Sequence, residues 1–278
     1  MTSRDVPIKT IHLFPVLDQL LIELLKSLSP EDWDKPTLAK LWTVKDIAAH
    51  LLDGNMRTIS SKQQFTGETP SSISNYQDLV NYLNELNATW VKAMKRVSPA
   101  LLVQLLEITG KQYAEHMASL DPFARAIFSV AWAGEEQSVN WFHIAREYTE
   151  RWHHQQQIRE AVNKPGIMHQ ELFYPCIATF MYALPHTYRN VNADVGTLIE
   201  IIVLGETTGN WYLQKSMENW VLTTNNDKPA DCVVSISTDT AWKLFTKGIT
   251  PNLALQNSTL KGNIKLGEKI FEAVAVMA

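Results

Sequence analysis

Residues 140–162 read NWFHIAREYTERWHHQQQIREAV and predict one long amphipathic helix. We expect this helix to end before residues 163–166 (NKPG), because proline cannot continue a helix and glycine is favoured just after its end. Such a helix buries its apolar face against other helices, so the stretch favours a helical bundle. The apolar side chains that recur at helical spacing are Trp141, Ile144, Ala145, Tyr148, Trp152, Ile158 and Val162.

Three further segments before residue 165 have helical periodicity. They cover residues 16–28, residues 43 to about 59, and residues 75–94. Thr43 is a good N-cap for the second helix, with Asp46 at the third helical position, where a negative charge favours the helix dipole. Four long helices of this kind predict a four-helix bundle.

Weaker signals lie between these helices. A shorter helical piece is expected around residues 101–117, and residues 132–134 (WAG) predict a break. Residues 67–72 (GETPSS) predict a loop. We therefore place the bundle in residues 1–165.

The character of the chain changes after residue 165. A helix is expected over residues 172–184, and short helices near 240–246 and from 266 to the end. Segments rich in β-branched residues predict strands. The sequence thus predicts an α+β multidomain protein, with the four-helix bundle in residues 1–165 and a small α/β domain in residues 166–278. The predicted strands are residues 197–204, 220–224 and 232–237.

Composition excludes several classes of protein. The chain has 278 residues, 45% of them hydrophobic and 19% charged, as in an ordinary globular protein. Its formal net charge of -4 and its scattered basic residues argue against nucleic-acid binding. No apolar run approaches the roughly 18–20 residues that span a bilayer, so no membrane association is expected. Nor does the opening sequence resemble a signal peptide, and we expect a cytoplasmic protein. Cys176 and Cys232 are too few for a disulfide scaffold or an all-cysteine zinc site.

A polar stripe runs beside the apolar face of residues 140–162. His143, Glu147, Glu150 and His154 are four, three and four residues apart, which aligns them along one side of a helix. Glu150 and His154 would thus offer a carboxylate oxygen and an imidazole nitrogen about one turn apart, as helices do for a shared metal ion. A solvated contact between residues four apart, or an exposed polar face, would show the same spacing.

A third ligand must come from elsewhere in the chain. His50 lies among apolar residues in DIAAHLL, residues 46–52, on a helix with a clear core face. A histidine there either faces a ligand or is a hydrogen-bonded core residue. Two ligands from one helix and one from another would leave open positions on the metal, as in catalytic sites.

At these residues the chain resembles a known family. Residues 42–51 (WTVKDIAAHL) and 145–159 (AREYTERWHHQQQIR) are similar to the DinB-like superfamily, and within it to the mycothiol-dependent maleylpyruvate isomerase type. The resemblance implies a four-helix bundle that binds a divalent metal through His50, Glu150 and His154. Zinc is the metal of the isomerase type, with nickel or another transition metal as alternatives.

The resemblance extends more weakly to the C-terminal region. Residues 233–237 (VVSIS) and 261–267 (KGNIKLG) are similar to the sterol-carrier-like domain that accompanies these bundles. One departure concerns the last motif, where Gln157 stands at a position that is acidic in many isomerase-type members. An amide there would tune the basicity of a ligand less than a carboxylate does. His153 points to another face of the helix and is interpreted as a surface or outer-shell group.

The resemblance implies a metal-dependent thiol transferase, isomerase or hydrolase that acts on a small molecule with a low-molecular-weight thiol as cosubstrate. His143 and Glu147 are candidates for a substrate-facing role, although a solvated face is an equal alternative. The chain is expected to be a monomer or a homodimer.

Two alternatives remain open. In one, the protein is a non-catalytic small-molecule or lipid-binding protein, with a cavity in the sterol-carrier-like domain. In the other, the metal is structural, with His143 or Glu147 as a fourth ligand. The aromatic residues that would line a lipid cavity, or simply form the core, are Trp211, Trp220, Trp242, Phe245 and Phe271.

Overall fold

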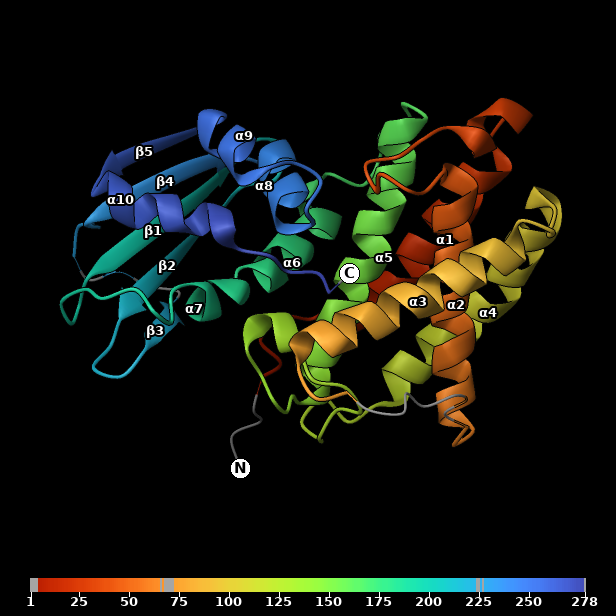
Figure 1. Ribbon diagram of the computed structural model, residues 1–278, viewed down its shortest axis with the longest axis horizontal. Coiled ribbons are helices and arrows are strands. Elements are labelled where there is room, and N and C mark those ends of the chain that lie inside the picture. Colours follow the sequence, from red (N-terminus) through yellow and green to blue (C-terminus); the bar gives the residue numbers. More distant parts are fainter. Residues whose placement is uncertain (1–4, 66, 68–72, 224–225, 227, 278) are drawn as a thin grey trace. The chain divides into compact units, whose positions relative to one another are not determined.

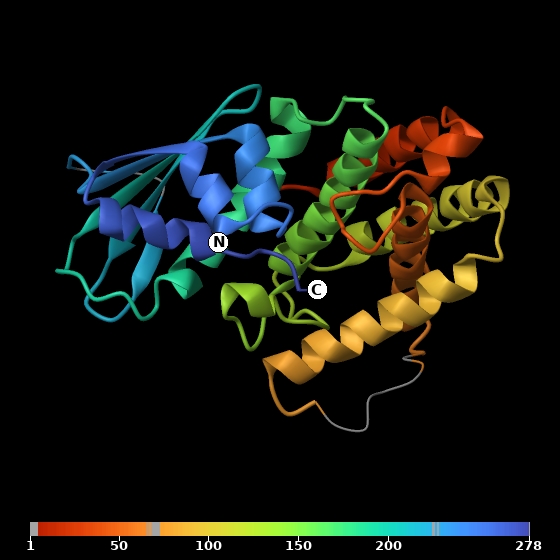
Figure 2. The same cartoon turned by 45° about the horizontal axis from the view of Figure 1, so that its top comes forward.

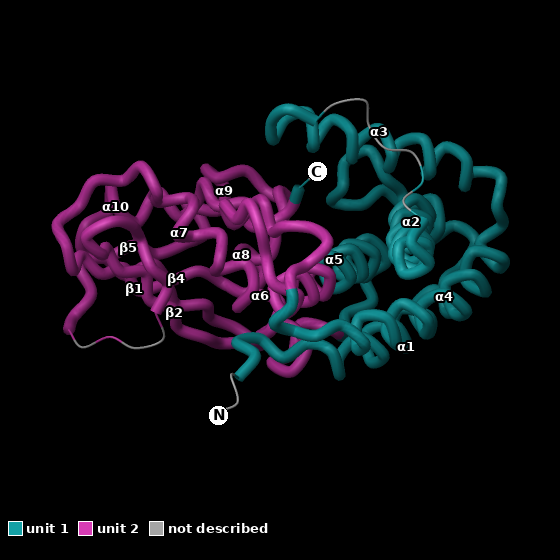
Figure 3. Tube along the Cα trace, turned by 90° about the horizontal axis from the view of Figure 1, so that it is seen from below, with its two compact units in different colours: residues 1–124, 150–166, 277–278 teal, residues 125–149, 167–276 magenta. Residues whose placement is uncertain are grey.

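The computed structural model describes residues 5–65, 67, 73–223, 226 and 228–277, so most of the loop predicted at 67–72 lies outside the described residues. The chain divides into two compact units (Figure 3). Unit 1 comprises residues 1–124, 150–166 and 277–278, and unit 2 comprises residues 125–149 and 167–276. A helical N-terminal region and a C-terminal region with a small mixed sheet confirm the predicted α+β class. The domain boundary at residue 165 stays a prediction.

Unit 1 is built from helices (Figure 1). Helix α4 packs against α1 and α2, and α2 also packs against α3, as can be followed in Figures 1 and 2. The piece predicted as short, around residues 101–117, is the 21-residue helix α4. The helices of unit 1 are α1 (Phe14–Lys26), α2 (Val44–Lys62), α3 (Tyr76–Met94), α4 (Pro99–Ser119) and the second half of α5 (Asn140–Ala161), with 3-10 turns at Ile11–Leu13 and Pro30–Asp34. The first half of α5 and the 3-10 turn at Ala131–Ala133 belong to unit 2.

The core of unit 1 joins α1, α2, α4 and the end of α5. It confirms the apolar faces predicted for residues 16–28 and 43–59, although α2 continues to Lys62. Because α2 and the end of α5 share this core, their positions relative to each other are fixed. The side chains on their other faces are therefore held in defined positions. Buried members include Leu21, Leu25, Ile47, Ala48, Leu52, Leu102, Leu106, Ile158 and Val162.

The start of α2 is fixed by a capping box. The Thr43 hydroxyl accepts a hydrogen bond from the backbone N–H of Asp46, and the Asp46 carboxylate accepts one from the backbone N–H of Thr43 at 3.0 Å. The same carboxylate forms an ion pair with Lys95 at 2.7 Å, which ties α2 to the end of α3. The predicted N-cap is confirmed.

Thr43→Ala is expected to lower the free energy of unfolding by about 1 kcal/mol, because a backbone N–H of the first turn loses its acceptor. Urea denaturation followed by circular dichroism would measure the change. Thr43→Ser keeps the hydroxyl and should be within a few tenths of a kcal/mol of the parent. Equal stability of the alanine and serine variants would contradict this role for the hydroxyl.

Unit 2 contains a five-stranded sheet in the order β3-β2-β1-β4-β5. Strands β1 and β4 are parallel, whereas the other neighbours are antiparallel. Helices α8, α9 and α10 pack against β1, β4 and β5. The elements are β1 (Leu198–Leu204), β2 (Gly209–Lys215), β3 (Trp220–Thr223), β4 (Cys232–Ser237) and β5 (Ser258–Gly262), with helices α6 (Gln170–Phe180), α7 (Ala183–Thr187), α8 (Thr238–Phe245), α9 (Pro251–Gln256) and α10 (Ile264–Glu268) and a 3-10 turn at Lys269–Glu272.

Burial alternates along the strands because one face of the sheet packs on a core. In β1, the side chains of Ile199, Ile201 and Val203 are buried, whereas Glu200 and Ile202 between them are half-buried. This alternation is typical of a sheet with one face on a core. The five aromatic residues named above as cavity or core candidates are all buried, and Phe245 stacks on Phe180 at 5.7 Å between ring centroids, which favours the core interpretation.

Several expectations in this region need correction. Strands β2 and β5 and helix α9 were not predicted. The helix expected from residue 266 to the end is wrong, because α10 ends at Glu268 and the chain is extended after the turn at Lys269–Glu272. Within the described residues, no helix is both long and apolar enough to cross a membrane.

Candidate metal centre

Helix α2 supplies the first candidate ligand, His50. Its neighbours Ala49 and Leu51 are buried, and the His50 ring is half-buried at the edge of this core face. In the part of the chain that the structure describes, the His50 Nδ1 atom is buried and has no hydrogen-bond partner. Burial lowers the pKa of His50 well below its ordinary value, and the nearby charge of His154 adds to this effect. A neutral imidazole with an unsatisfied buried nitrogen suits metal coordination.

Helix α5 supplies Glu150 and His154, which belong to the unit 1 part of this helix. The His154 Nε2 atom lies 3.5 Å from a carboxylate oxygen of Glu150. On the other side of the ring, His154 Nδ1 lies 2.9 Å from the amide oxygen of Gln157. Since an amide oxygen can only accept, the contact with Gln157 puts a proton on Nδ1 and leaves Nε2, on the side of Glu150, as the ring nitrogen that can coordinate a metal ion.

These three side chains converge although His50 and Glu150 are far apart in sequence. One potential ligand atom from each of His50, Glu150 and His154 lies within 4.8 Å of the other two. The rings of His50 and His154 meet edge to face with centroids 4.6 Å apart. A tetrahedral ion with bonds of about 2.1 Å needs its ligand atoms about 3.4 Å apart. The Glu150–His154 pair already has this spacing, and the residues present therefore fit a divalent metal ion.

Aromatic side chains surround the cluster. The Trp42 ring centroid lies 4.8 Å from that of His50 and 6.1 Å from that of His154. The ring of His153 lies 3.9 Å from that of His154. His153 is buried, so the interpretation of this residue as a surface group is wrong and the outer-shell alternative stands. Such surroundings reduce the effective dielectric constant and strengthen the interactions of charges at the cluster.

Residues 151–159 of α5 are all buried despite their polar sequence. Charged and amide side chains are almost never fully buried without partners, so this burial requires an explanation. The sequence predicted one buried apolar face and missed this property. The buried polar residues of this stretch are Arg151, His153, His154, Gln155, Gln156, Gln157 and Arg159.

Arg151 links α5 to α2. Its guanidinium group donates a hydrogen bond to the side-chain oxygen of Asn55, whose amide in turn donates to the Thr109 hydroxyl at 2.9 Å. The guanidinium carbon also lies 3.6 Å from the ring centroid of Tyr113. These contacts hold α5 against α2 beside the cluster. No sequence signal identifies them, because the partners are remote in the chain.

The other two members of the polar stripe fall in unit 2. His143 is buried, and its Nδ1 atom lies 3.1 Å from a guanidinium nitrogen of Arg146 and 4.0 Å from the carboxylate of Glu147. Arg146 also forms an ion pair with Glu147. Among the described residues, neither His143 nor Glu147 is in the group of side chains that lie within reach of one ion. Their substrate-facing role stays a proposal.

Comparison with known proteins gives one family. The model of the mycothiol maleylpyruvate isomerase N-terminal domain matches residues 15–159. No curated protein matches the chain at a significant level.

One solved structure shares the fold at low identity. A crystal structure of a histidine-to-alanine mutant of the mycothiol-dependent maleylpyruvate isomerase is 12% identical, with a TM-score of 0.52, covering 90% of this chain and 91% of that one. A second structure of the isomerase is 13% identical, with a TM-score of 0.49 and coverage of 84% and 86%. The sterol carrier protein domain 2 of Helicoverpa armigera is 19% identical over 28% of this chain and 65% of its own, with a TM-score of 0.23.

Proposed function

Because the chain belongs to the mycothiol maleylpyruvate isomerase N-terminal domain family, we propose that it is a divalent-metal-dependent enzyme that uses a low-molecular-weight thiol to isomerise or modify a small molecule. The observation that carries this proposal is the convergence of His50, Glu150 and His154 within 4.8 Å. Zinc is the metal proposed. Three protein ligands leave an open coordination position, as in catalytic zinc sites.

The metal would be held by the two imidazoles and the Glu150 carboxylate. When bound, zinc acts as a Lewis acid that lowers the pKa of a thiol or water molecule. The protein residues supply the orientation. Gln157 fixes the ring of His154, Trp42 packs against the ring of His50, and Glu150 would partly balance the positive charge of the ion. We further propose that His143 and Glu147 face the substrate.

The two alternatives that the sequence left open, a structural metal and a lipid-binding protein, have less support. A structural zinc usually has four protein ligands, and the group found in the described residues has three. A lipid carrier needs a cavity lined by the aromatic residues of unit 2, whereas these side chains are buried, and the rings of Trp211, Phe245 and Trp220 pack against Tyr174, Phe180 and Tyr188.

A turnover assay would test the proposed function. Zinc-loaded protein is expected to isomerise maleylpyruvate only when a thiol is supplied, with mycothiol and glutathione as the two thiols compared. Chelation should reduce the rate at least 100-fold, because the metal supplies the activated thiol, and added zinc should restore it.

Each contrary outcome has a definite meaning. Turnover that needs no thiol, or that survives complete removal of the metal, would refute the proposal. Firm metal binding without turnover of this acid by either thiol would limit the protein to another substrate or to a structural metal. Copurified lipid in that case would favour the binding protein.

A further inference from the structure

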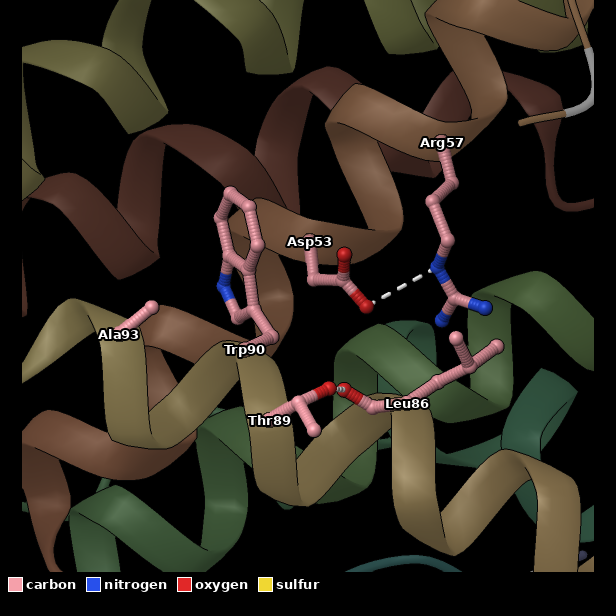
Figure 4. A pocket seen from close by; sticks show the side chains of 6 residues that line it. All are labelled: Asp53, Arg57, Leu86, Thr89, Trp90 and Ala93. Atoms are coloured by element: carbon pink, nitrogen blue, oxygen red, sulfur yellow. Dashed lines mark hydrogen bonds and ion pairs between the residues drawn. The ribbon is translucent and has the colours of Figure 1, made fainter. Parts of the chain in front are cut away.

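An open groove of about 270 Å³ lies between α2 and α3 in unit 1 (Figure 4). None of the three candidate ligands lines it. Asp53 and Arg57 come from α2, and the opposite wall comes from α3. The lining residues are Asp53, Arg57, Leu86, Thr89, Trp90 and Ala93.

The Arg57 side chain is held from one side. Its Nε atom lies 2.9 Å from a carboxylate oxygen of Asp53, whose side chain is only 8% exposed, whereas that of Arg57 is 46% exposed. Within the described residues, the two terminal nitrogens of the guanidinium group have no hydrogen-bond partner. The ion pair places Nε on the side of Asp53, and the two terminal nitrogens of the planar guanidinium group form a fork, the arrangement that binds a carboxylate with two parallel hydrogen bonds.

The opposite wall is mostly apolar, with Leu86, Trp90 and Ala93 beside Thr89. Trp90 is anchored because its indole N–H donates to the backbone oxygen of Ala49 at 2.8 Å. In the close-up, the Trp90 ring lies beside the Asp53 carboxylate, and Leu86 lies next to the guanidinium group of Arg57 (Figure 4). This wall would cover the carbon skeleton of a small ligand, while the guanidinium group binds its charged end.

The groove follows the helix face that carries His50. Asp53 and Arg57 come three and seven residues later, which is about one and two turns along α2, or about 5 and 10 Å. Side chains lean toward the N-terminus of their helix, so that of Arg57 leans back toward the turn of His50. The adjoining Asn87 of α3 is buried, and its amide oxygen has no hydrogen-bond partner in the described residues.

We propose that Arg57, oriented by Asp53, binds the carboxylate of a small organic acid in this groove. The inference rests on the proposed function and deepens it, since it names a specificity-determining residue near the candidate metal centre. The carboxylate belongs either to the acid that is transformed or to the thiol cosubstrate. Both share the chemistry that Arg57 recognises.

The charge balance of the groove makes the geometry of Arg57 decisive. Asp53 neutralises most of the net field of Arg57, so the carboxylate is held by directional hydrogen bonds more than by long-range attraction. A lysine keeps the positive charge but loses the fork, and it is therefore not a conservative replacement here. This expectation separates a carboxylate site from an ordinary surface ion pair between residues four apart.

Titration of maleate into the zinc-loaded protein, followed by NMR line broadening of the maleate signal, would test the proposal. Arg57→Gln is expected to weaken maleate binding at least tenfold, and Arg57→Lys at least fivefold. Arg96→Gln removes the same charge from an exposed arginine after the end of α3 and should leave the affinity within twofold. The neutral diamide maleamide should not bind at the concentrations used.

The outcomes separate the groove from the metal centre. Undiminished maleate binding by Arg57→Gln would overturn the proposal, because a carboxylate held by the metal does not need Arg57. No binding to the parent protein would overturn it as well. If the protein turns over, a raised KM for the acid alone assigns the carboxylate to the acid, and a raised KM for the thiol alone assigns it to the thiol. If no turnover is found, the proposed function fails, but the titration still shows whether Arg57 binds a carboxylate in the groove.

Discussion

His154→Ala is expected to weaken zinc binding more than about 100-fold. Loss of an outer-shell partner costs about 10–100-fold in metal affinity, and loss of a direct ligand should cost more. The remaining ligands, His50 and Glu150, come from two different helices, so no single helix would supply two ligands to the ion. Competition with a chromogenic zinc chelator would measure the affinity, and elemental analysis would give the metal content of protein purified without chelator.

Two further variants control this experiment. His12→Ala removes an exposed histidine of unit 1 outside the cluster and should leave the zinc affinity unchanged. Gln157→Leu removes the acceptor of the His154 Nδ1 proton and should give an intermediate loss of about 10–100-fold. Far-UV circular dichroism should show the helices of all three variants intact. An undiminished zinc affinity in folded His154→Ala protein would refute the assigned ligand set.

The ligand pair on α5 illustrates what local sequence can predict. Helical periodicity is enough to place Glu150 and His154 one turn apart on one side of a helix, and in the structure the His154 Nε2 atom lies 3.5 Å from a carboxylate oxygen of Glu150. Periodicity says nothing about which residue of another helix faces them. The helical pattern offered His50 only as a candidate, with a core residue as the alternative, and the family resemblance assigned it as the third ligand, because convergence of two helices depends on the packing of the whole core.

The contacts of Arg151 that hold α5 against α2 could not be predicted from the sequence for the same reason. Its partner Asn55 is 96 residues away, and a buried arginine has the same local pattern as an arginine on a solvated helix face. Burial of a polar helix follows from what surrounds it, which no periodicity in its own sequence reveals.

The sheet shows a second kind of limit. Strand β1 was predicted because LIEIIVL is rich in β-branched residues, whereas β2, with the sequence GNWYLQK, has none and begins with residues typical of turns. Strand β2 exists because it pairs with β1 and β3 and buries Trp211 and Leu213 on one face. Tertiary pairing thus overrides a weak local preference.

Arg151→Met is expected to lower the free energy of unfolding of the metal-free protein by about 3–5 kcal/mol at neutral pH. Removing one partner of a buried charged network leaves the others without compensation. Asn55 loses its donor, and the Asp18 carboxylate loses a positive charge 3.9 Å away. Methionine fills part of the volume of arginine, so the loss reports the polar contacts more than a cavity. Urea denaturation in the presence of chelator would measure it.

The pH dependence of this loss tests its cause. Burial raises the pKa of Asp18, and the charge of Arg151 opposes that rise. Without Arg151 the pKa of Asp18 in the folded state should rise further above the unfolded value. A carboxyl group with a raised folded pKa favours the folded state below its unfolded pKa, and this contribution is lost as the pH rises through the folded pKa. The deficit of Arg151→Met should therefore be largest at neutral pH and shrink toward pH 4.

A double variant separates the two partners of Arg151. In Asp18→Asn/Arg151→Met the carboxylate is gone. The loss of unfolding free energy caused by Arg151→Met, measured relative to Asp18→Asn, should therefore be smaller at neutral pH and nearly independent of pH. The side chain of Asp18 is packed against Gly110, and asparagine has nearly the same shape, so the replacement itself should cause little strain. A pH-independent deficit in the single variant would show that Asn55 and the Tyr113 ring, rather than Asp18, account for the stabilisation by Arg151.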